Sequence, residues 1–183
     1  MKVVLKRPRG VLGWRRVYRS YLQGFPPSER KPFWLIVRMT WQGKTDTWCL
    51  YAEGKFAGFC STINGREAVL LDYLAVSPAL QGKGIGTQTL HALQEKYRDR
   101  GLFVEIESPF EEGPDQSERI RRKQFYRACG MEPFGVMANV FGVKMELLGR
   151  NCLLDYEAYH EFYLENYSAY AAEHLQELPY PKQ

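Results

Sequence analysis

The chain has 183 residues, of which 45% are hydrophobic and 25% are charged. This composition is ordinary for a globular protein with one domain and a sizeable core. The formal net charge of +4 favours an anionic ligand but is too small to indicate a nucleic-acid-binding protein, so the basic residues near the N-terminus predict a solvated face. No segment reaches membrane-spanning length, and the apolar run at residues 3–5 is too short for a signal peptide.

The cysteines and histidines argue against a metal site and against disulfide bonds. They lie far apart in the sequence, and none forms a C-x-x-C pair or a Cys–His pair at metal-ligand spacing. We therefore predict reduced, mostly buried thiols, no metal and a cytoplasmic location. The residues concerned are Cys49, Cys60, Cys129, Cys152, His91, His160 and His174.

The N-terminal half predicts a short strand, two helices and three strands. The first strand ends at Pro8, and the helices span residues 13–23 and residues 32–41. Turn signals at residues 53–55 and 64–66 separate β-prone segments, which indicates a three-stranded antiparallel meander. The third strand, residues 68–76, is nearly continuous in apolar residues, as is typical of a strand covered on both faces.

The C-terminal half predicts a helix over residues 85–100 capped by Gly101, a strand over 102–108, and a parallel relation between this strand and the preceding one. After a loop, Asp115 and Glu118 suggest a capping box for a helix that ends at Gly130. A hairpin and one long helix over residues 155–178 follow. That helix carries a tyrosine stripe, which we expect to pack against the domain or a second subunit, although it could also wall an aromatic acceptor pocket. The stripe comprises Tyr156, Tyr159, Tyr163, Tyr167 and Tyr170.

The glycine-rich segment SPALQGKGIGTQTL, residues 77–90, does not match two common phosphate-binding motifs. A Walker A loop requires Ser or Thr after its lysine, but Gly84 follows Lys83. A dinucleotide fingerprint that starts at Gly82 would place its third glycine at Thr87.

The pattern that remains is Q-x-x-G-x-G, formed by Gln81, Gly84 and Gly86. Glycines let backbone amides converge, and the N-terminus of the following helix adds partial positive charge. The segment therefore predicts a pyrophosphate cradle. The alternative is a plain turn in which the glycines only permit tight packing.

Two segments resemble signatures of the GNAT superfamily of N-acyltransferases. The pattern V-x-P-x-x-Q-x-x-G-x-G, residues 76–86, is similar to the family's acetyl-CoA pyrophosphate motif, and RRKQFYRACGM, residues 121–131, resembles its second signature. The resemblance covers residues 1–148 and implies an α+β fold with a mixed, mostly antiparallel sheet flanked by helices. It also implies a GNAT domain over residues 1–150, with residues 151–183 as a C-terminal helical extension similar to that of one poorly characterised bacterial branch.

The resemblance implies how the donor, acetyl-CoA, is bound. Backbone groups of Leu74, Ala75 and Val76 would pair with the pantetheine arm, and a bulge at Leu74 or Ala75 would let one amide polarise the thioester carbonyl. Backbone amides in the glycine turn, with the Lys83 side chain nearby, would hold the pyrophosphate. These turn residues are Gln81, Gly82, Lys83, Gly84, Ile85, Gly86 and Thr87.

The resemblance also implies an acid for the departing thiolate and suggests a base for the amine. Tyr126 matches the family's tyrosine and is protonated at neutral pH, with Arg119 and Arg122 on the same helical face. Glu105 occupies a position where some members carry a glutamate. Glu107 and Asp72 compete for the role of base, and for all three the alternative is a structural ion pair or exposure at the end of the sheet.

The expected reaction is acetyl transfer to an amine by direct attack in a ternary complex. The acceptor is a small-molecule or peptide amine, and acids in the loop after residue 108 (Glu111, Glu112 and Asp115) suggest a cationic one. We expect no nucleic-acid or membrane partner, and a monomer or homodimer. The main rival is a non-catalytic acyl-CoA-binding or regulatory domain, and a nucleic-acid-binding module is the third reading.

Overall fold

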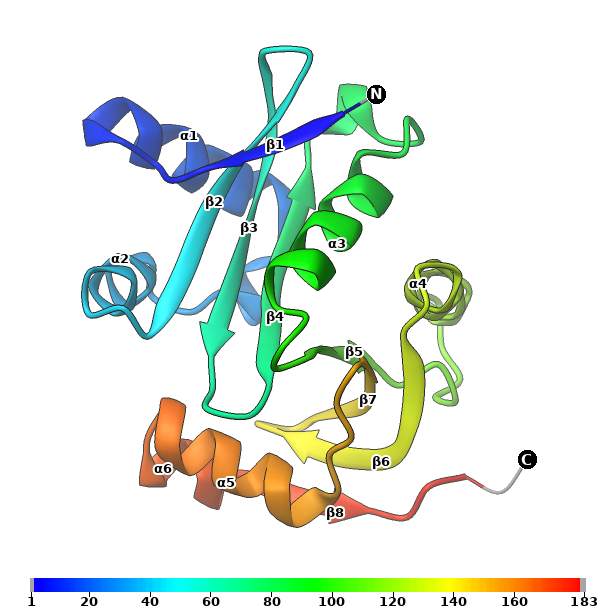
Figure 1. Cartoon of the computed structure of the whole chain (residues 1–183). Coiled ribbons are helices and arrows are strands. Elements are labelled where there is room, and N and C mark those ends of the chain that lie inside the picture. The colour runs from blue at the N-terminus through cyan, green and yellow to red at the C-terminus, as the bar shows by residue number, and fades with distance from the viewer. Residues whose placement is uncertain (1, 182–183) are drawn as a thin grey trace. The chain divides into compact units, whose positions relative to one another are not determined.

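The computed structural model describes residues 2–181, and the contacts within the chain divide it into two units (Figure 1). Unit 1 consists of Met1–Asn64 and Leu71–Lys96, and unit 2 consists of Gly65–Leu70 and Tyr97–Gln183. Strand β4 (Val69–Val76) contributes its first two residues to unit 2 and the others to unit 1.

The strands of unit 1 follow the order β1-β2-β3-β4, with β1 at Val3–Lys6, β2 at Thr45–Ala52 and β3 at Lys55–Asn64. Strand β2 pairs antiparallel with both β1 and β3, and β3 and β4 run in opposite directions (Figure 1). The predicted meander is therefore confirmed. Within this unit β1 and β4 are the two outer strands.

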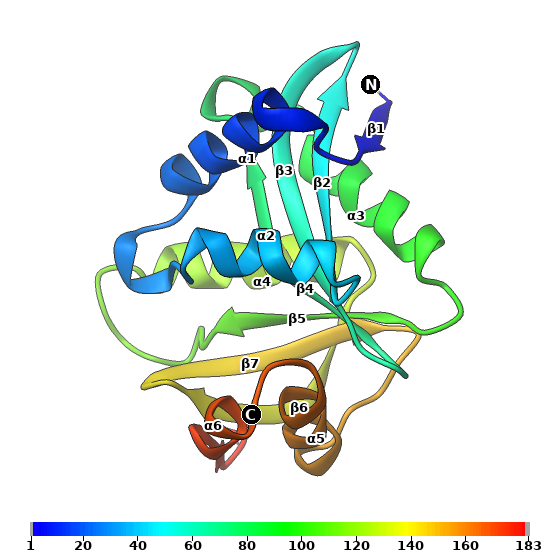
Figure 2. The same cartoon turned by 90° about the vertical axis from the view of Figure 1, so that its left-hand side faces the viewer.

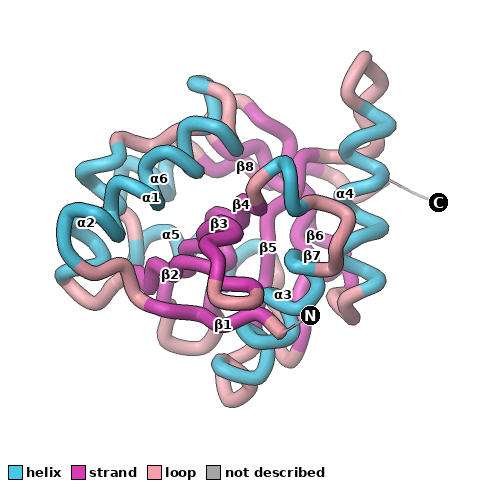
Figure 3. Tube along the Cα trace, turned by 90° about the horizontal axis from the view of Figure 1, so that it is seen from above, coloured by secondary structure: helices cyan, strands magenta, loops and turns pink. Residues whose placement is uncertain are grey.

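Helices cover both faces of this sheet. Helices α1 (Gly10–Gly24) and α2 (Phe33–Trp41), joined by a short 3₁₀ turn η1 (Pro27–Glu29), lie on one face, and α3 (Ile85–Lys96) lies on the other (Figures 2 and 3). Burial of nearly all of β2 and β3 follows from this double cover. Helix α1 begins three residues before the predicted start, and α3 ends four residues before the predicted end.

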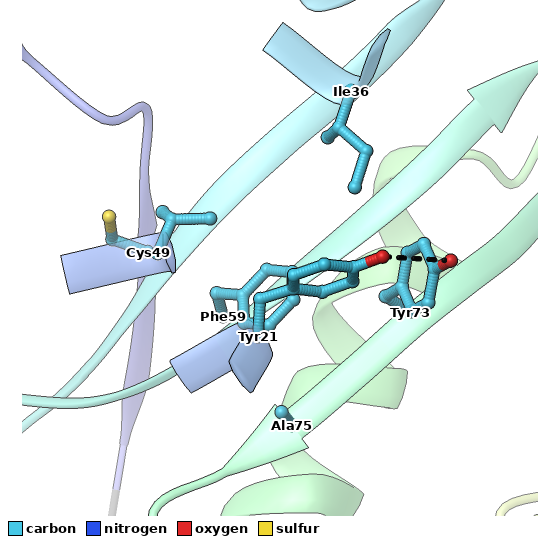
Figure 4. Packing of buried hydrophobic residues seen from close by; sticks show 7 residues of the cluster. Tyr21, Ile36, Cys49, Phe59, Tyr73 and Ala75 are labelled. Carbon is cyan, nitrogen blue, oxygen red and sulfur yellow. Dashed lines mark hydrogen bonds between the residues drawn. The ribbon is translucent and has the colours of Figure 1, made fainter. Parts of the chain in front are cut away.

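The core of unit 1 under α1 and α2 is built around two tyrosines (Figure 4). The rings of Tyr21 and Tyr73 meet edge to face at 5.1 Å, and their hydroxyl oxygens are 3.5 Å apart. The Tyr21 hydroxyl donates to the Lys31 carbonyl, and the Tyr73 hydroxyl donates to the Glu29 carbonyl. Burial raises the pKa of both phenols. Because both hydroxyls bond to backbone, the pair fixes the α1–α2 connection to the sheet.

Unit 2 contains β5 (Leu102–Glu107), β6 (Glu132–Val140), β7 (Val143–Arg150) and β8 (Leu175–Leu178) in the order β5-β7-β6-β8. These strands pair antiparallel, whereas Val69 and Leu70 of β4 pair parallel with Leu102 and Phe103 of β5. The sheet is therefore mixed and mostly antiparallel, and the predicted α+β class is confirmed.

Helices α4 (Gln116–Ala128) and α5 (Tyr156–Asn166) contact opposite faces of the unit 2 sheet. Lys123 of α4 contacts Glu146, which is the register partner of Ile106. On the other face, Phe103 packs against Tyr159 and Phe162 of α5. Side chains alternate between the two faces along a strand, so Phe103 and Ile106 of β5 lie on opposite faces of the sheet. Helix α4 therefore packs on the face of Ile106, and α5 packs on the face of Phe103.

Two local predictions are wrong. The segment expected to form one long helix breaks at Tyr167 into α5 and α6 (Ala169–Glu173) and ends as β8, which pairs with β6. The Ser168 side chain accepts a hydrogen bond from the Ala171 amide and so starts a new helix. The capping box is also absent among the described residues, because Asp115 makes no side-chain cap hydrogen bond.

The four cysteines are free thiols, as predicted, and three of them are buried. In the described part of the chain, no helix is long and apolar enough to cross a membrane.

Candidate functional site

The glycine turn lies where the sequence places it, between β4 and α3 in unit 1. Gly82 and Gly84 have φ of +74° and +75°. A Cβ atom at either position would meet no atom within 4 Å. Tight packing is therefore not the reason for these two glycines. The backbone needs a positive φ here, which glycine adopts without strain, and the space beside the turn is open.

Backbone amides of this turn are available to an anion. The first amide that donates within α3 is that of Gln88, which bonds to the Gly84 carbonyl at 3.0 Å. The amides of Ile85, Gly86 and Thr87 lie in the first turn, where a helix offers no acceptor. That turn contains no acidic side chain, and the Lys83 side chain is exposed beside it. This arrangement is suited to a polyanion such as a pyrophosphate.

A hydrogen bond from the Gln81 side chain connects the turn to the end of β4. Its Nε2 donates to the Val76 carbonyl at 3.2 Å. A short 3₁₀ turn, Pro78–Leu80, fills the interval between these two residues. Gln81 thus fixes the position of the turn relative to β4, and its own backbone bonds to the Pro78 carbonyl.

The three predicted pantetheine-binding residues lie at the end of β4. Ala75 is buried in the core beneath α1 and α2, whereas Leu74 and Val76 are half-buried on the opposite face. Strand β4 pairs with β5 at Val69 and Leu70, so the same edge of the strand further on, at Leu74–Val76, is placed to pair with an extended ligand. The bulge at Leu74 or Ala75 stays a prediction.

A strand irregularity that sequence reasoning missed lies on the neighbouring strand. The register between β2 and β3 shifts after Leu50, which pairs with Gly58, while Tyr51 pairs with Phe56. A Cβ atom at Gly58 would lie 2.0 Å from the Ala75 carbonyl oxygen, so only glycine fits there. A glycine within a strand pattern was the available signal.

Tyr126 lies on α4 in unit 2 and is half-buried. Its ring contacts Phe125 at a centroid distance of 5.2 Å. Desolvation raises the pKa of Tyr126 to about 12, against the opposing effect of the Arg122 charge. The phenol is therefore protonated throughout the neutral range, as a proton donor requires.

The candidate bases all have partners. Glu105 accepts hydrogen bonds from the hydroxyls of Tyr159 and Tyr163 at 2.7 and 2.9 Å. Glu107 lies 3.7 Å from Arg119, and Asp72 lies 2.7 Å from the Lys31 ammonium. Ion pairs thus hold Glu107 and Asp72, while phenols from the C-terminal extension hold Glu105. Which of them acts as the base stays a prediction.

The two arginines predicted near Tyr126 also have local partners. Arg119 donates to the Glu111 carbonyl at 2.8 Å, and Arg122 lies 3.6 Å from Glu118 in the same helix. A cofactor-binding role for either side chain stays a prediction.

A buried ionic cluster in unit 2 was not predicted. Glu146 is fully buried, and its Oε1 is 2.7 Å from the Lys123 ammonium and accepts a hydrogen bond from the Tyr180 hydroxyl. Desolvation, and then the Glu146 carboxylate, raise the pKa of Tyr180. The only signal in the sequence was one acid within an apolar strand segment, VKMELLG.

Two surface depressions are lined by residues outside the glycine turn. One, of about 370 Å³, lies along β6 and the segment after β8 in unit 2 and includes Tyr180. The other, of about 670 Å³, is lined by α2 and the residue after it: Phe33, Trp34, Val37, Arg38, Trp41 and Gln42. Among residues 2–181, no three His, Cys, Asp or Glu side chains are grouped so that they could hold a metal.

The model of the acetyltransferase (GNAT) family matches residues 14–131, which is more than half of the chain. No curated protein matches the chain by sequence. Solved structures with a similar fold include a Bacteroides thetaiotaomicron protein assigned to the GNAT acetyltransferases, with a TM-score of 0.75, 21% identity, and coverage of 90% of this chain and 97% of that one.

Two further structures of this fold contain the donor or its product. The Bacillus subtilis acetyltransferase in complex with CoA has a TM-score of 0.58 and 17% identity, over 83% of this chain and 99% of that one. A GNAT acetyltransferase from Elizabethkingia anophelis with acetyl-CoA bound has a TM-score of 0.59 and 14% identity, over 82% and 97%. At these identities the likeness shows the fold alone.

Proposed function

The chain belongs to the GNAT acetyltransferase family, and we propose that it transfers the acetyl group of acetyl-CoA to an amine nitrogen. The observation that carries the proposal is the turn between β4 and α3, where the amides in the first turn of α3 lie beside the exposed Lys83 side chain and no acidic side chain is present in that turn. Amides without a helical acceptor, together with a nearby cation, suit a polyanion, which supports a role in binding a pyrophosphate.

Donor binding uses two adjoining parts of unit 1. The pyrophosphate of CoA bonds to amides of residues 82–87, since the Gln81 amide already donates to the Pro78 carbonyl, and the Lys83 ammonium neutralises part of its charge. The pantetheine arm pairs with the backbone of Leu74, Ala75 and Val76 at the edge of β4. The pairing of β4 with β5 at Val69 and Leu70, before Leu74, and the first-turn amides of α3, which have no acceptor within the helix, support this assignment.

The reaction requires a neutral amine. A base removes one proton from the ammonium form, the nitrogen lone pair attacks the thioester carbon, and the C–S bond breaks as the C–N bond is completed. The nitrogen loses a second proton, and the departing thiolate takes a proton from the Tyr126 phenol, which solvent then restores. Tyr126 is protonated at neutral pH, as this role requires, and its raised pKa makes the phenol a weaker acid than an ordinary tyrosine.

Glu105 is the first candidate for the base, with Glu107 and Asp72 as its competitors. The phenols that hold the Glu105 carboxylate belong to α5, on the face of the unit 2 sheet opposite α4 and Tyr126, whereas Glu107 pairs with Arg119 of α4. The acceptor is a small-molecule or peptide amine, and a cationic one suits Glu112 and Asp115, which are exposed in the loop before α4. The protein acts in the cytoplasm as a monomer or homodimer.

An acceptor panel tests this function. The purified protein is incubated with acetyl-CoA and polyamines, aminoglycosides or short peptides, and free CoA is measured with a thiol reagent. Reactions without acceptor correct for hydrolysis and for the four cysteines of the protein. We expect CoA release that depends on a cationic amine. Release with only neutral or acidic acceptors would contradict the cationic assignment, and CoA binding without turnover on any amine would indicate an acyl-CoA-binding domain.

A further inference from the structure

Charge is distributed unevenly along the chain. Residues 1–44 contain eleven Lys and Arg but one acid, Glu29, and so carry a net charge of +10, whereas the whole chain carries only +4. The remaining residues are therefore net acidic. Residues 1–44 belong to unit 1, and this segment includes β1, α1 and α2.

Several of these cations are not neutralised by the protein. Arg7 forms an ion pair with Asp46, and Arg16 donates to the Tyr51 hydroxyl. In contrast, four exposed arginines on or beside α1 and α2 have no carboxylate partner within the range that the structure describes. These four are Arg9, Arg15, Arg19 and Arg38.

The same two helices expose large apolar side chains. Val11 is 83% exposed, Trp41 is 79% exposed and Trp34 is 62% exposed. Leu12, Tyr18 and Leu22 are exposed as well. The two tryptophans belong to the depression of about 670 Å³ along α2, which also contains Arg38. Single exposed apolar residues are ordinary, but a group of this kind marks an interaction surface.

The cations and the apolar side chains belong to one layer. Phe33 of α2 packs against the rings of Trp14 and Tyr18 of α1, at centroid distances of 6.1 and 4.9 Å. Both helices cover the same face of the unit 1 sheet (Figure 2), and on each helix the exposed residues lie on the side opposite its buried residues. We call this layer, with its four unpaired arginines and six exposed apolar residues, the basic apolar surface.

We propose that the basic apolar surface adsorbs to the surface of an anionic lipid bilayer. Tryptophan and tyrosine favour the headgroup region, aliphatic side chains enter the acyl boundary, and arginines bond to lipid phosphates. The expectation of no membrane partner rested on the absence of a spanning segment, which has no bearing on adsorption.

Other occupants fit the same residues less well. A second copy would bring Arg15, Arg19 and Arg38 against identical cations, which disfavours self-association through this face. A nucleic acid would use the arginines and aromatic rings but not Val11 or Leu12. A single bound peptide would occupy a groove, whereas these apolar side chains extend over two helices.

Co-sedimentation with vesicles tests the proposal on the full chain. The vesicles contain phosphatidylcholine alone, or phosphatidylcholine with 30% phosphatidylglycerol. We expect binding to the anionic vesicles that weakens as salt rises, and little binding to the neutral ones. Equal binding to both, or binding to neither, overturns the proposal.

Two sets of variants identify the surface. Arg15→Glu/Arg19→Glu/Arg38→Glu should lower the partition coefficient at least about 100-fold, since loss of each basic residue alone costs about fivefold near an anionic membrane and the added carboxylates are repelled. Trp34→Ser/Trp41→Ser should weaken binding at high salt, where the apolar contribution dominates. The matched controls lie outside the surface and should have small effects. They are Arg66→Glu/Arg98→Glu/Arg121→Glu, with the same change in net charge, and Leu153→Ser/Leu164→Ser.

Two outcomes would assign the surface to another partner. If a single-stranded oligonucleotide binds more tightly than the vesicles and loses affinity in the arginine variant, the surface binds nucleic acid. If sedimentation shows a dimer that Trp34→Ser/Trp41→Ser dissociates, the surface is an interface between copies. Either result contradicts the lipid proposal. Vesicle binding needs neither acetyl-CoA nor an acceptor, so its outcome is independent of acetyl transfer.

Discussion

The hydroxyl of Tyr159 on α5 donates a hydrogen bond of 2.7 Å to Glu105 on β5, between residues 54 positions apart in the sequence. Tyr163, one helical turn later, donates to the same carboxylate oxygen. The C-terminal extension therefore supplies both phenols that hold the first candidate base. Burial and the Glu105 charge raise the pKa of Tyr159 well above its ordinary value, so the phenol remains a donor.

Tyr159→Phe should lower the free energy of unfolding by about 1.5–3 kcal/mol, the range for a lost hydrogen bond to a charged group. The ring stays in place, and only the donor is removed. Denaturant unfolding measures the change. Tyr170→Phe is the matched control, because Tyr170 is exposed and should show almost no effect. Equal effects of the two variants would mean that the bond to Glu105 does not contribute.

Gly84→Ala should destabilise the protein by about 1–2 kcal/mol and also weaken CoA binding. The cost comes from forcing a residue with a Cβ atom to φ of +75°, and the binding loss comes from displaced amides. Thermal unfolding and calorimetric titration with CoA measure the two effects.

Gly43→Ala is the control for that variant, because Gly43 has the same φ and equally open surroundings but lies between α2 and β2. It should cost similar stability and leave CoA affinity unchanged. If both variants bind CoA equally well, the turn does not hold the pyrophosphate.

Tyr126→Phe should lower kcat while CoA affinity is retained, since the ring keeps its packing and only the proton donor is lost. Because the pKa of Tyr126 is about 12, the wild-type rate should show no alkaline decline from this residue between pH 7 and 10. Steady-state rates across that range provide the check. An alkaline decline that disappears in Tyr126→Phe would contradict the raised pKa.

The same pKa has a consequence for stability. The phenol has a pKa near 10 in the unfolded chain and about 12 in the folded one, so the folded state binds its proton more tightly. This contribution is fully present below pH 10 and is lost as the pH rises from 10 to 12. Tyr126→Phe should therefore unfold with a weaker dependence on pH in that window than the wild type.

Lys123→Met should destabilise the protein by about 3–5 kcal/mol, because it leaves the buried carboxylate of Glu146 without its cation. Lys123→Met/Glu146→Met should recover much of the loss, since both charges are then removed. Lys144→Met breaks the exposed pair with Glu111 and should cost less than about 1 kcal/mol. A stable Lys123→Met variant would show that the buried pair is not formed.

Local features were predicted well where local chemistry decides them. The turn between β4 and α3 follows from glycine spacing, and Asp155 starts α5 by accepting from the Ala158 amide. The final helix was predicted too long because its tyrosine stripe continues through the Ser168 break. Its last segment has helical periodicity but pairs with β6, and tertiary pairing overrides local propensity.

The sequence by itself determined the order of most elements, the free thiols, the glycine turn and the resemblance to the family. These depend on the backbone preferences of glycine and on apolar periodicity, which are properties of neighbouring residues. Only the tertiary structure decided why Gly82 and Gly84 are glycines, which partners hold Glu105 and Glu146, and that unpaired arginines share a layer with exposed tryptophans. Each of these depends on side chains far apart in sequence, whose contacts no local pattern encodes.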